Sequence, residues 1–207
     1  MKFDEILANE ELPSRKREFV ESLKAFYETN NHLTPNQEKY WNSIYEDYCE
    51  SAQLRKREWE ETYDDEKREV ARICAAYYIQ TTGKWSARYF IELATDVLKI
   101  EGFIPTEKQY RAMCTNKYAK RILEETRSEP KYKAGEFVKF RSGKVPYRVL
   151  RSHGNPKAAL VLETHAGPVT TAAKGAKLYK ILLMGTQETF LVEERVLKTY
   201  RRKNGKN

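Results

Sequence analysis

The sequence has no long apolar run, and its few cysteines do not form a framework. No hydrophobic run approaches the roughly 18 residues that are needed to span a bilayer, and the segment Met1 to Leu7 lacks the apolar core of a signal peptide. We therefore expect a water-soluble, cytoplasmic protein with no membrane contact. Cys49, Cys74 and Cys114 lie far apart and without CxxC spacing, so we expect them to be reduced, buried thiols.

Catalytic and metal-binding motifs are also missing. The chain has no nucleophile-elbow, zinc-protease or P-loop sequence. It therefore contains no motif that indicates acyl transfer, zinc proteolysis or nucleotide hydrolysis. His32, His153 and His165 have no ligand-like partners nearby in the sequence. The carboxylates lie beside Lys and Arg on expected helix faces, which is typical of solvated pairs. We expect no enzyme activity, no catalytic residue, no metal site and no cofactor.

What is present differs on the two sides of residue 127. From residue 1 to 127, apolar side chains recur at spacings of three and four, which predicts an α-helical domain. One helix is expected to begin at Ser14. The stretch 35–82 has neither Gly nor Pro, so it predicts either one long helix or two in series with a break near 62–65. Further helices are expected from Ser86 to Gly102 and from Thr106 to Ser128.

Two helix starts in this region resemble each other. Thr34-Pro35-Asn36-Gln37 predicts a capping box, and Pro105-Thr106 with Gln109 repeats the same chemistry. The similarity predicts a degenerate helix-loop-helix repeat, or alternatively two independent uses of the same N-cap residues.

The segment 128–200 has a different pattern, with short apolar runs between turns. These runs predict five strands, at 136–141, 146–151, 158–163, 178–184 and 189–192. So few strands suit a small closed barrel, since closure removes unpaired edges. The expected fold class is therefore α+β and multidomain, with a helical domain at 1–127, a small β-barrel at 128–200 and a basic tail at 201–207.

The predicted barrel resembles a known class. The run Gly135 to Gly143, followed by Pro146-Tyr147-Arg148-Val149, is similar to the first hairpin of SH3-like barrels of the KOW type, and Phe190 to Leu197 is similar to their last strand and terminal turn. The likeness covers about a third of the chain. It implies the fold, and it implies binding to nucleic acid, ribosomes, RNA polymerase or other proteins.

The whole chain also resembles an uncharacterised protein of tailed phages. The likeness rests on Phe103 to Arg111, on Asn116 to Leu123 and on the Lys131-Tyr132 entry to the barrel. It implies a location in the host cytoplasm and brings no chemistry with it.

The net charge of +8 is unevenly distributed along the chain. Residues 1–127 carry 21 Lys and Arg against 24 Asp and Glu, a balance of −3, while residues 128–207 carry 17 against 6, a balance of +11. A polyanionic partner explains such asymmetry, because each cation set against a phosphate releases condensed counterions. A solubilising surface is the alternative interpretation.

We therefore expect DNA or RNA to bind residues 128–207. The candidate binding residues share positive charge or a base-stacking ring, and they are Lys139, Arg141, Lys144, Tyr147, Arg148, Arg151, Lys174, Lys177, Lys180, Arg201, Arg202 and Lys203. The small, cationic loop at 168–177 is expected to be flexible, so that it can approach a sugar-phosphate backbone closely or become ordered on binding. No base-reading motif occurs, so binding should be electrostatic and weakly sequence-specific.

A second class of function remains open at this stage. The protein would then be a protein-interaction or virion-associated structural module, in which residues 1–127 contact a partner through Trp41, Trp59 and Trp85. Salt separates the two classes, because phosphate binding weakens steeply as salt rises and an aromatic interface does not.

Overall fold

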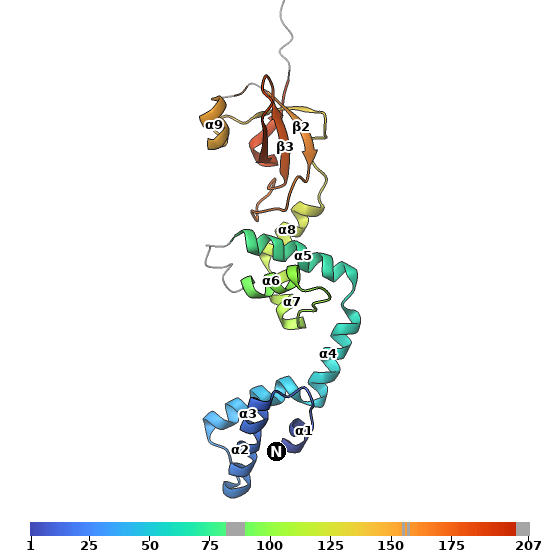
Figure 1. Cartoon of the computed structure of the whole chain (residues 1–207), viewed down its shortest axis with the longest axis vertical. Coiled ribbons are helices and arrows are strands. Elements are labelled where there is room, and N and C mark those ends of the chain that lie inside the picture. The colour runs from blue at the N-terminus through green and yellow to red at the C-terminus, as the bar shows by residue number, and fades with distance from the viewer. Residues whose placement is uncertain (82–89, 155, 157, 202–207) are drawn as a thin grey trace, which may run out of the picture. The chain divides into compact units, whose positions relative to one another are not determined.

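The computed structural model in Figure 1 describes residues 1–81, 90–154, 156 and 158–201. It combines helices with one antiparallel sheet, which confirms the α+β class. The chain divides into two units, Met1–Asp64 and Asp65–Asn207. The predicted boundary between residues 127 and 128 lies inside the second unit, where helix α8 ends. No helix within the described ranges is long and apolar enough to cross a membrane.

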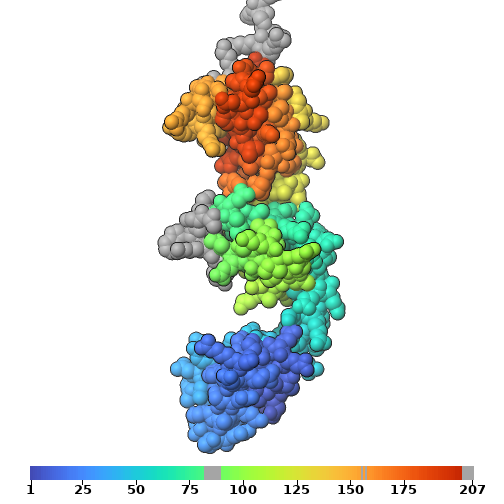
Figure 2. Space-filling model, in the orientation of Figure 1, coloured from blue at the N-terminus to red at the C-terminus, as the bar shows by residue number. Residues whose placement is uncertain are grey.

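The first unit is helical and has its own core. Its elements are α1 (Phe3–Leu7), α2 (Ser14–Asn30), α3 (Pro35–Tyr48) and α4 (Glu50–Thr62). Phe3 and Trp41 pack their rings 4.4 Å apart at the centre of this core, together with Val20 and Leu23 from α2. Helix α4 has no buried residue, so its charge-rich sequence is solvated as its composition predicts. In Figure 2 this unit is the blue to cyan body.

The stretch without Gly or Pro is interrupted twice. Cys49 has extended backbone angles between α3 and α4, and the helix ends again before Asp65. The second break lies where the sequence predicts it. The first depends on α1 and the loop after it, because the Asn9 side chain donates to the Tyr48 carbonyl (2.9 Å) and the Glu5 carboxylate accepts from the Glu50 N–H (3.2 Å). These contacts satisfy backbone groups that the interruption leaves without helical partners.

The second unit begins with helices around a separate core. They are α5 (Asp65–Gln80), α6 (Ile91–Lys99), α7 (Glu107–Cys114) and α8 (Lys117–Arg127). Cys74 and Cys114 are buried in this core as free thiols. A hydrogen bond that the Cys114 thiol donates to Cys74, together with burial, raises the pKa of Cys114. The predicted helix start at Ser86 lies outside the described residues.

A five-stranded sheet follows in the order β4-β3-β2-β1-β5. Its strands are β1 (Phe137–Phe140), β2 (Ala159–Thr164), β3 (Leu178–Leu183), β4 (Thr189–Glu193) and β5 (Leu197–Thr199), with a 3-10 turn at Glu194–Val196. Every neighbouring pair is antiparallel. Alternate residues such as Val138, Val161 and Ile181 fill a core on one face, as the period of a strand requires.

The strand expected at 146–151 is wrong, because this segment forms helix α9 (Tyr147–His153). Pro146 precedes the helix, and its carbonyl accepts from the Leu150 N–H at 2.9 Å. Strand β1 is paired by β2 on one side and by β5 on the other, so no place remains beside it for a hairpin partner. Helix α9 instead inserts the fully buried Val149 into the core of the sheet.

The loop at 168–177, which the sequence predicts to be flexible and free to approach a backbone, is instead packed against other parts of the second unit. Val169 and Ala176 are buried in the core of helices α5–α8, and the Gly175 N–H donates to the carboxylate of Glu125 at 2.9 Å. The loop returns to the sheet through the Arg195 N–H, which donates to the Gly175 carbonyl at 2.8 Å. This segment therefore joins the helical layer to the sheet inside the second unit.

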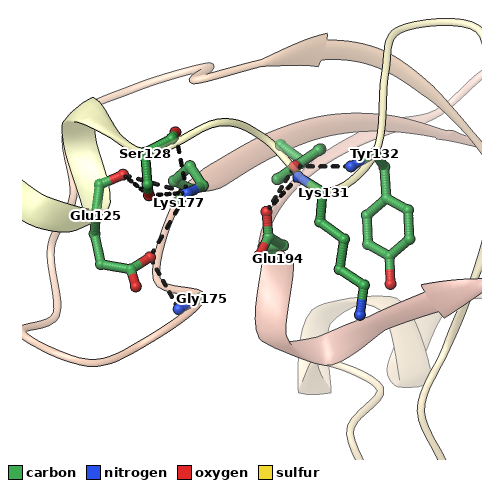
Figure 3. A network of polar contacts seen from close by, with 8 residues as sticks. Glu125, Ser128, Lys131, Tyr132, Gly175, Lys177 and Glu194 are labelled. Carbon is green, nitrogen blue, oxygen red and sulfur yellow. Dashed lines mark hydrogen bonds and ion pairs between the residues drawn. The ribbon is translucent and has the colours of Figure 1, made fainter.

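Polar side chains connect the helical layer to the sheet where this segment joins them (Figure 3). The Lys177 ammonium lies 3.9 Å from the Glu125 carboxylate and donates to the Ser128 carbonyl at 3.2 Å. Beside it, the Glu194 carboxylate accepts from the Lys131 N–H (3.0 Å) and from the Tyr179 hydroxyl (2.8 Å). Burial raises the pKa of Tyr179, so the phenol stays protonated and keeps donating.

Candidate nucleic-acid interface

The outer face of strands β1 and β5 brings two lysines together. Val138 and Phe140 point into the core, so Phe137 and Lys139 occupy the opposite face of β1. In the antiparallel register Lys139 lies directly opposite Lys198 of β5. Directly opposed side chains have Cβ atoms about 4.5–5.5 Å apart. No ion pair involves either lysine among the residues that the structure describes.

Two aromatic rings lie next to this lysine pair. The Tyr200 N–H donates to the Phe137 carbonyl at 3.1 Å, which continues the β1–β5 ladder by one residue. The two rings contact each other with centroids 6.5 Å apart, and Phe137 is 46% exposed. We call Phe137, Lys139, Lys198 and Tyr200 the sheet-face cluster.

Other predicted residues continue from the end of β1. The Arg141 Nε–H donates to the Leu197 carbonyl at 2.9 Å, which holds the stem of this exposed side chain against β5. Lys144 is exposed in the turn that follows, and its N–H donates to the Arg141 carbonyl at 3.0 Å. The turn is tight because Gly143 takes a positive φ of 66°.

Helix α9 presents a second basic surface, which we call the α9 face. Tyr147, Arg148 and Arg151 are exposed, and Tyr147 with 74% exposure is the most open aromatic residue among those described. Positions 147 and 151, and 148 and 151, are neighbours on a helix surface. Figure 2 shows α9 standing at the surface beside the sheet, in light orange. The segment predicted to be the second strand of a hairpin therefore presents its basic residues and Tyr147 from a helix.

The remaining predicted residues have different surroundings. Lys174 is exposed in the junction segment, and Lys180 is exposed on β3 opposite Leu191 of β4. Lys177 is 3% exposed and paired with Glu125, so it cannot meet a phosphate, and we remove it from the interface. Arg201 is exposed, whereas Arg202 and Lys203 lie outside the described residues.

The structure adds Lys198 and Tyr200 to the candidate residues. Neither residue is among the candidates named from the sequence, and Lys198 belongs to β5. The alternation of the buried Leu197 with the exposed Lys198 is a strand signal, although three residues are too few to make it visible without the pairing to β1.

The two described tryptophans of the competing protein-interaction hypothesis are less accessible than that hypothesis requires. Trp41 is 4% exposed and lies in the core of the first unit. Trp59 is half-buried and contacts the Tyr63 ring at 5.7 Å. Trp85 is not among the described residues.

Histidine and acidic side chains form no metal centre in the part of the chain that is described, where no group of three or more His, Cys, Asp or Glu side chains is suitably placed. His153 contacts the Glu188 carboxylate through Nε2 at 3.0 Å and packs against the Phe190 ring. These two contacts connect the end of α9 to the residue before β4 and to β4 itself. No protein-family model, no curated protein and no solved structure matches the chain.

Proposed function

We propose that the sheet region of the second unit binds the phosphate backbone of nucleic acid, as a non-enzymatic accessory factor of a nucleic-acid or nucleoprotein assembly. The observation that carries the proposal is the opposed pair Lys139 and Lys198. Like charges directly opposite each other on a sheet destabilise it. A feature that costs stability in the free protein is typical of a functional site, and a phosphate between the two ammonium groups would relieve the repulsion.

The surrounding charge supports the same ligand. Arg141, Lys144, Arg148 and Arg151 are exposed near the ends of β1 and α9, and none of them forms an ion pair among the described residues. Only 6 acidic residues accompany 17 Lys and Arg in residues 128–207. Such a surface attracts a polyanion without reading its sequence.

We further propose that the sheet is a small SH3-like barrel of the KOW type. The strand order supports this, because β1 to β4 form a meander and β5 returns past a 3-10 turn to pair with β1. The core on one face of the sheet, with Val149 of α9 closing it, is consistent with a curved sheet. The replacement of the second strand by α9 is a departure from the pattern on which the resemblance rested.

The test is fluorescence anisotropy of the full chain with labelled DNA and RNA oligomers between 50 and about 200 mM salt. We expect affinity to fall steeply with salt, and Lys139→Gln/Lys198→Gln to lower the slope of log K against log salt by about 2. The control Lys108→Gln/Lys120→Gln removes the same charge from exposed positions of α7 and α8. Absence of binding to every oligomer at low salt would refute the proposal.

A further inference from the structure

The outer face of the sheet carries a row of apolar side chains that are not part of the core. In register across β3, β2 and β1, Leu182 lies opposite Leu160, which lies opposite Phe137, and Phe137 contacts Tyr200. The core residues of the same strands point to the other face. The row therefore consists of apolar side chains that are left in contact with solvent.

Exposed neighbours extend this apolar surface. Leu162 is 39% exposed on β2 and Leu191 is 58% exposed on β4, while Phe137, at 46% exposure, adds an aromatic ring. An apolar patch on a soluble domain that is bordered by polar groups marks a binding surface. The polar residues at the edge of this apolar surface therefore indicate which class of ligand it binds.

That border is cationic on the side of β1 and β5. Lys139 and Lys198 lie two residues along their strands from Phe137 and Tyr200, on the same face, which is about 7 Å along the strand direction. A ligand that contacts both pairs needs a planar apolar group within several ångströms of a negative charge. Each nucleotide of an unpaired strand has this construction, because its base presents a π face and its phosphate is anionic.

Duplex nucleic acid does not fit the same surface equally well. Its bases are stacked on one another inside the helix and leave only their edges and the backbone for a protein. The lysine pair would still contact a duplex, but the row Leu160, Phe137 and Tyr200 would have no partner. An acidic peptide would likewise use the charges and leave the rings without partners.

We infer that the sheet-face cluster binds single-stranded nucleic acid, with an unpaired base stacked on Phe137 and Tyr200 and the adjoining phosphate between Lys139 and Lys198. This inference rests on the proposed function, and it narrows the ligand from nucleic acid in general to an unpaired strand. Aromatic stacking of this kind tolerates every base, so the site has little sequence preference.

The experiment compares a labelled 12-nucleotide dT oligomer with a mixed-sequence 12-base-pair duplex, using the full chain at one salt concentration. We expect the wild type to bind the single strand more tightly. Tyr200→Leu and Phe137→Leu remove a ring and keep an apolar side chain, so each should weaken single-strand binding about tenfold, and duplex binding less than twofold. Tyr200→Phe should retain the wild-type affinity, and matching far-UV circular dichroism and melting curves check that each variant is folded.

The outcomes separate the inference from the proposed function. Equal affinity for both oligomers, or no effect of the ring substitutions while the lysine double variant weakens both, would overturn the inference and leave the proposed function intact. No binding to either oligomer would overturn both. Binding to anionic lipid vesicles without binding to the oligomers would assign the apolar row to a membrane surface and also overturn both.

Discussion

Lys177 shows how the environment of one residue decides its role. Its ammonium group is surrounded by the Glu125 carboxylate and by carbonyls of Glu125 and Ser128, and its side chain is 4% exposed. Burying a charge requires compensation of this kind, because transfer from water costs several kcal/mol per ion. The residue is consequently part of the structure and not of the ligand surface.

Removing the charge of Lys177 should be costly. Lys177→Met leaves the Glu125 carboxylate buried without its cation, and we expect the free energy of unfolding of the second unit to fall by about 3 kcal/mol. Urea denaturation followed by far-UV circular dichroism measures this change. The matched control Lys174→Met, at an exposed position three residues away, should change stability by less than about 0.5 kcal/mol. Equal effects of the two substitutions would contradict the role of the ion pair.

The paired helix starts show how far local chemistry determines an element. At Thr34, the hydroxyl accepts from the Gln37 N–H at 3.3 Å and the Gln37 side chain accepts from the Thr34 N–H at 2.9 Å. Thr106 and Gln109 repeat both distances. Both capping boxes form as the sequence predicts, because all of their partners lie within four residues of each other.

We therefore expect Thr34→Ala and Thr106→Ala to have the same cost, about 1 kcal/mol each. Differential scanning calorimetry should show the loss in the first unit for Thr34 and in the second unit for Thr106, since the two residues belong to different units. Serine at either position keeps the accepting oxygen and should restore most of the stability. A cost for only one of the two substitutions would mean that tertiary contacts, and not the caps, hold the other helix start.

At the scale of the whole molecule, the division at Asp64 and Asp65 has a practical consequence. The sheet segment buries Val169 and Ala176 in the core of helices α5–α8, and Gly175 is bonded to Glu125. A fragment that begins at residue 128 loses all of these partners, whereas a fragment that begins at residue 65 retains them.

We expect the fragment 65–207 to unfold cooperatively in urea with dispersed amide signals in its NMR spectrum. The fragment 128–207 should be much less stable or unfolded, because the apolar side chains of the junction would be exposed and Lys177 would lose its anion. Cooperative unfolding of 128–207 at the same denaturant midpoint as 65–207 would show that the sheet does not depend on the helices.

The sequence by itself determined the features that depend on neighbours along the chain. Helical periodicity, the two capping boxes, the break before Asp65 and most strands follow from residues a few positions apart. The concentration of positive charge in residues 128–207 is likewise visible in the sequence, whereas the exposure of Tyr147 is not, because an aromatic residue in an apolar run can equally be buried.

Tertiary structure decided whatever depends on partners far along the chain. Residues 147–151 alternate like a strand, yet they form α9 because β5, about 50 residues later, occupies the place beside β1. Lys177 and Lys198 both lie near loops in the sequence. Lys177 is buried beside Glu125, however, and Lys198 lies opposite Lys139 on the sheet. Local pattern contains no information about such partners, because burial and pairing are properties of the assembled core and not of a segment alone.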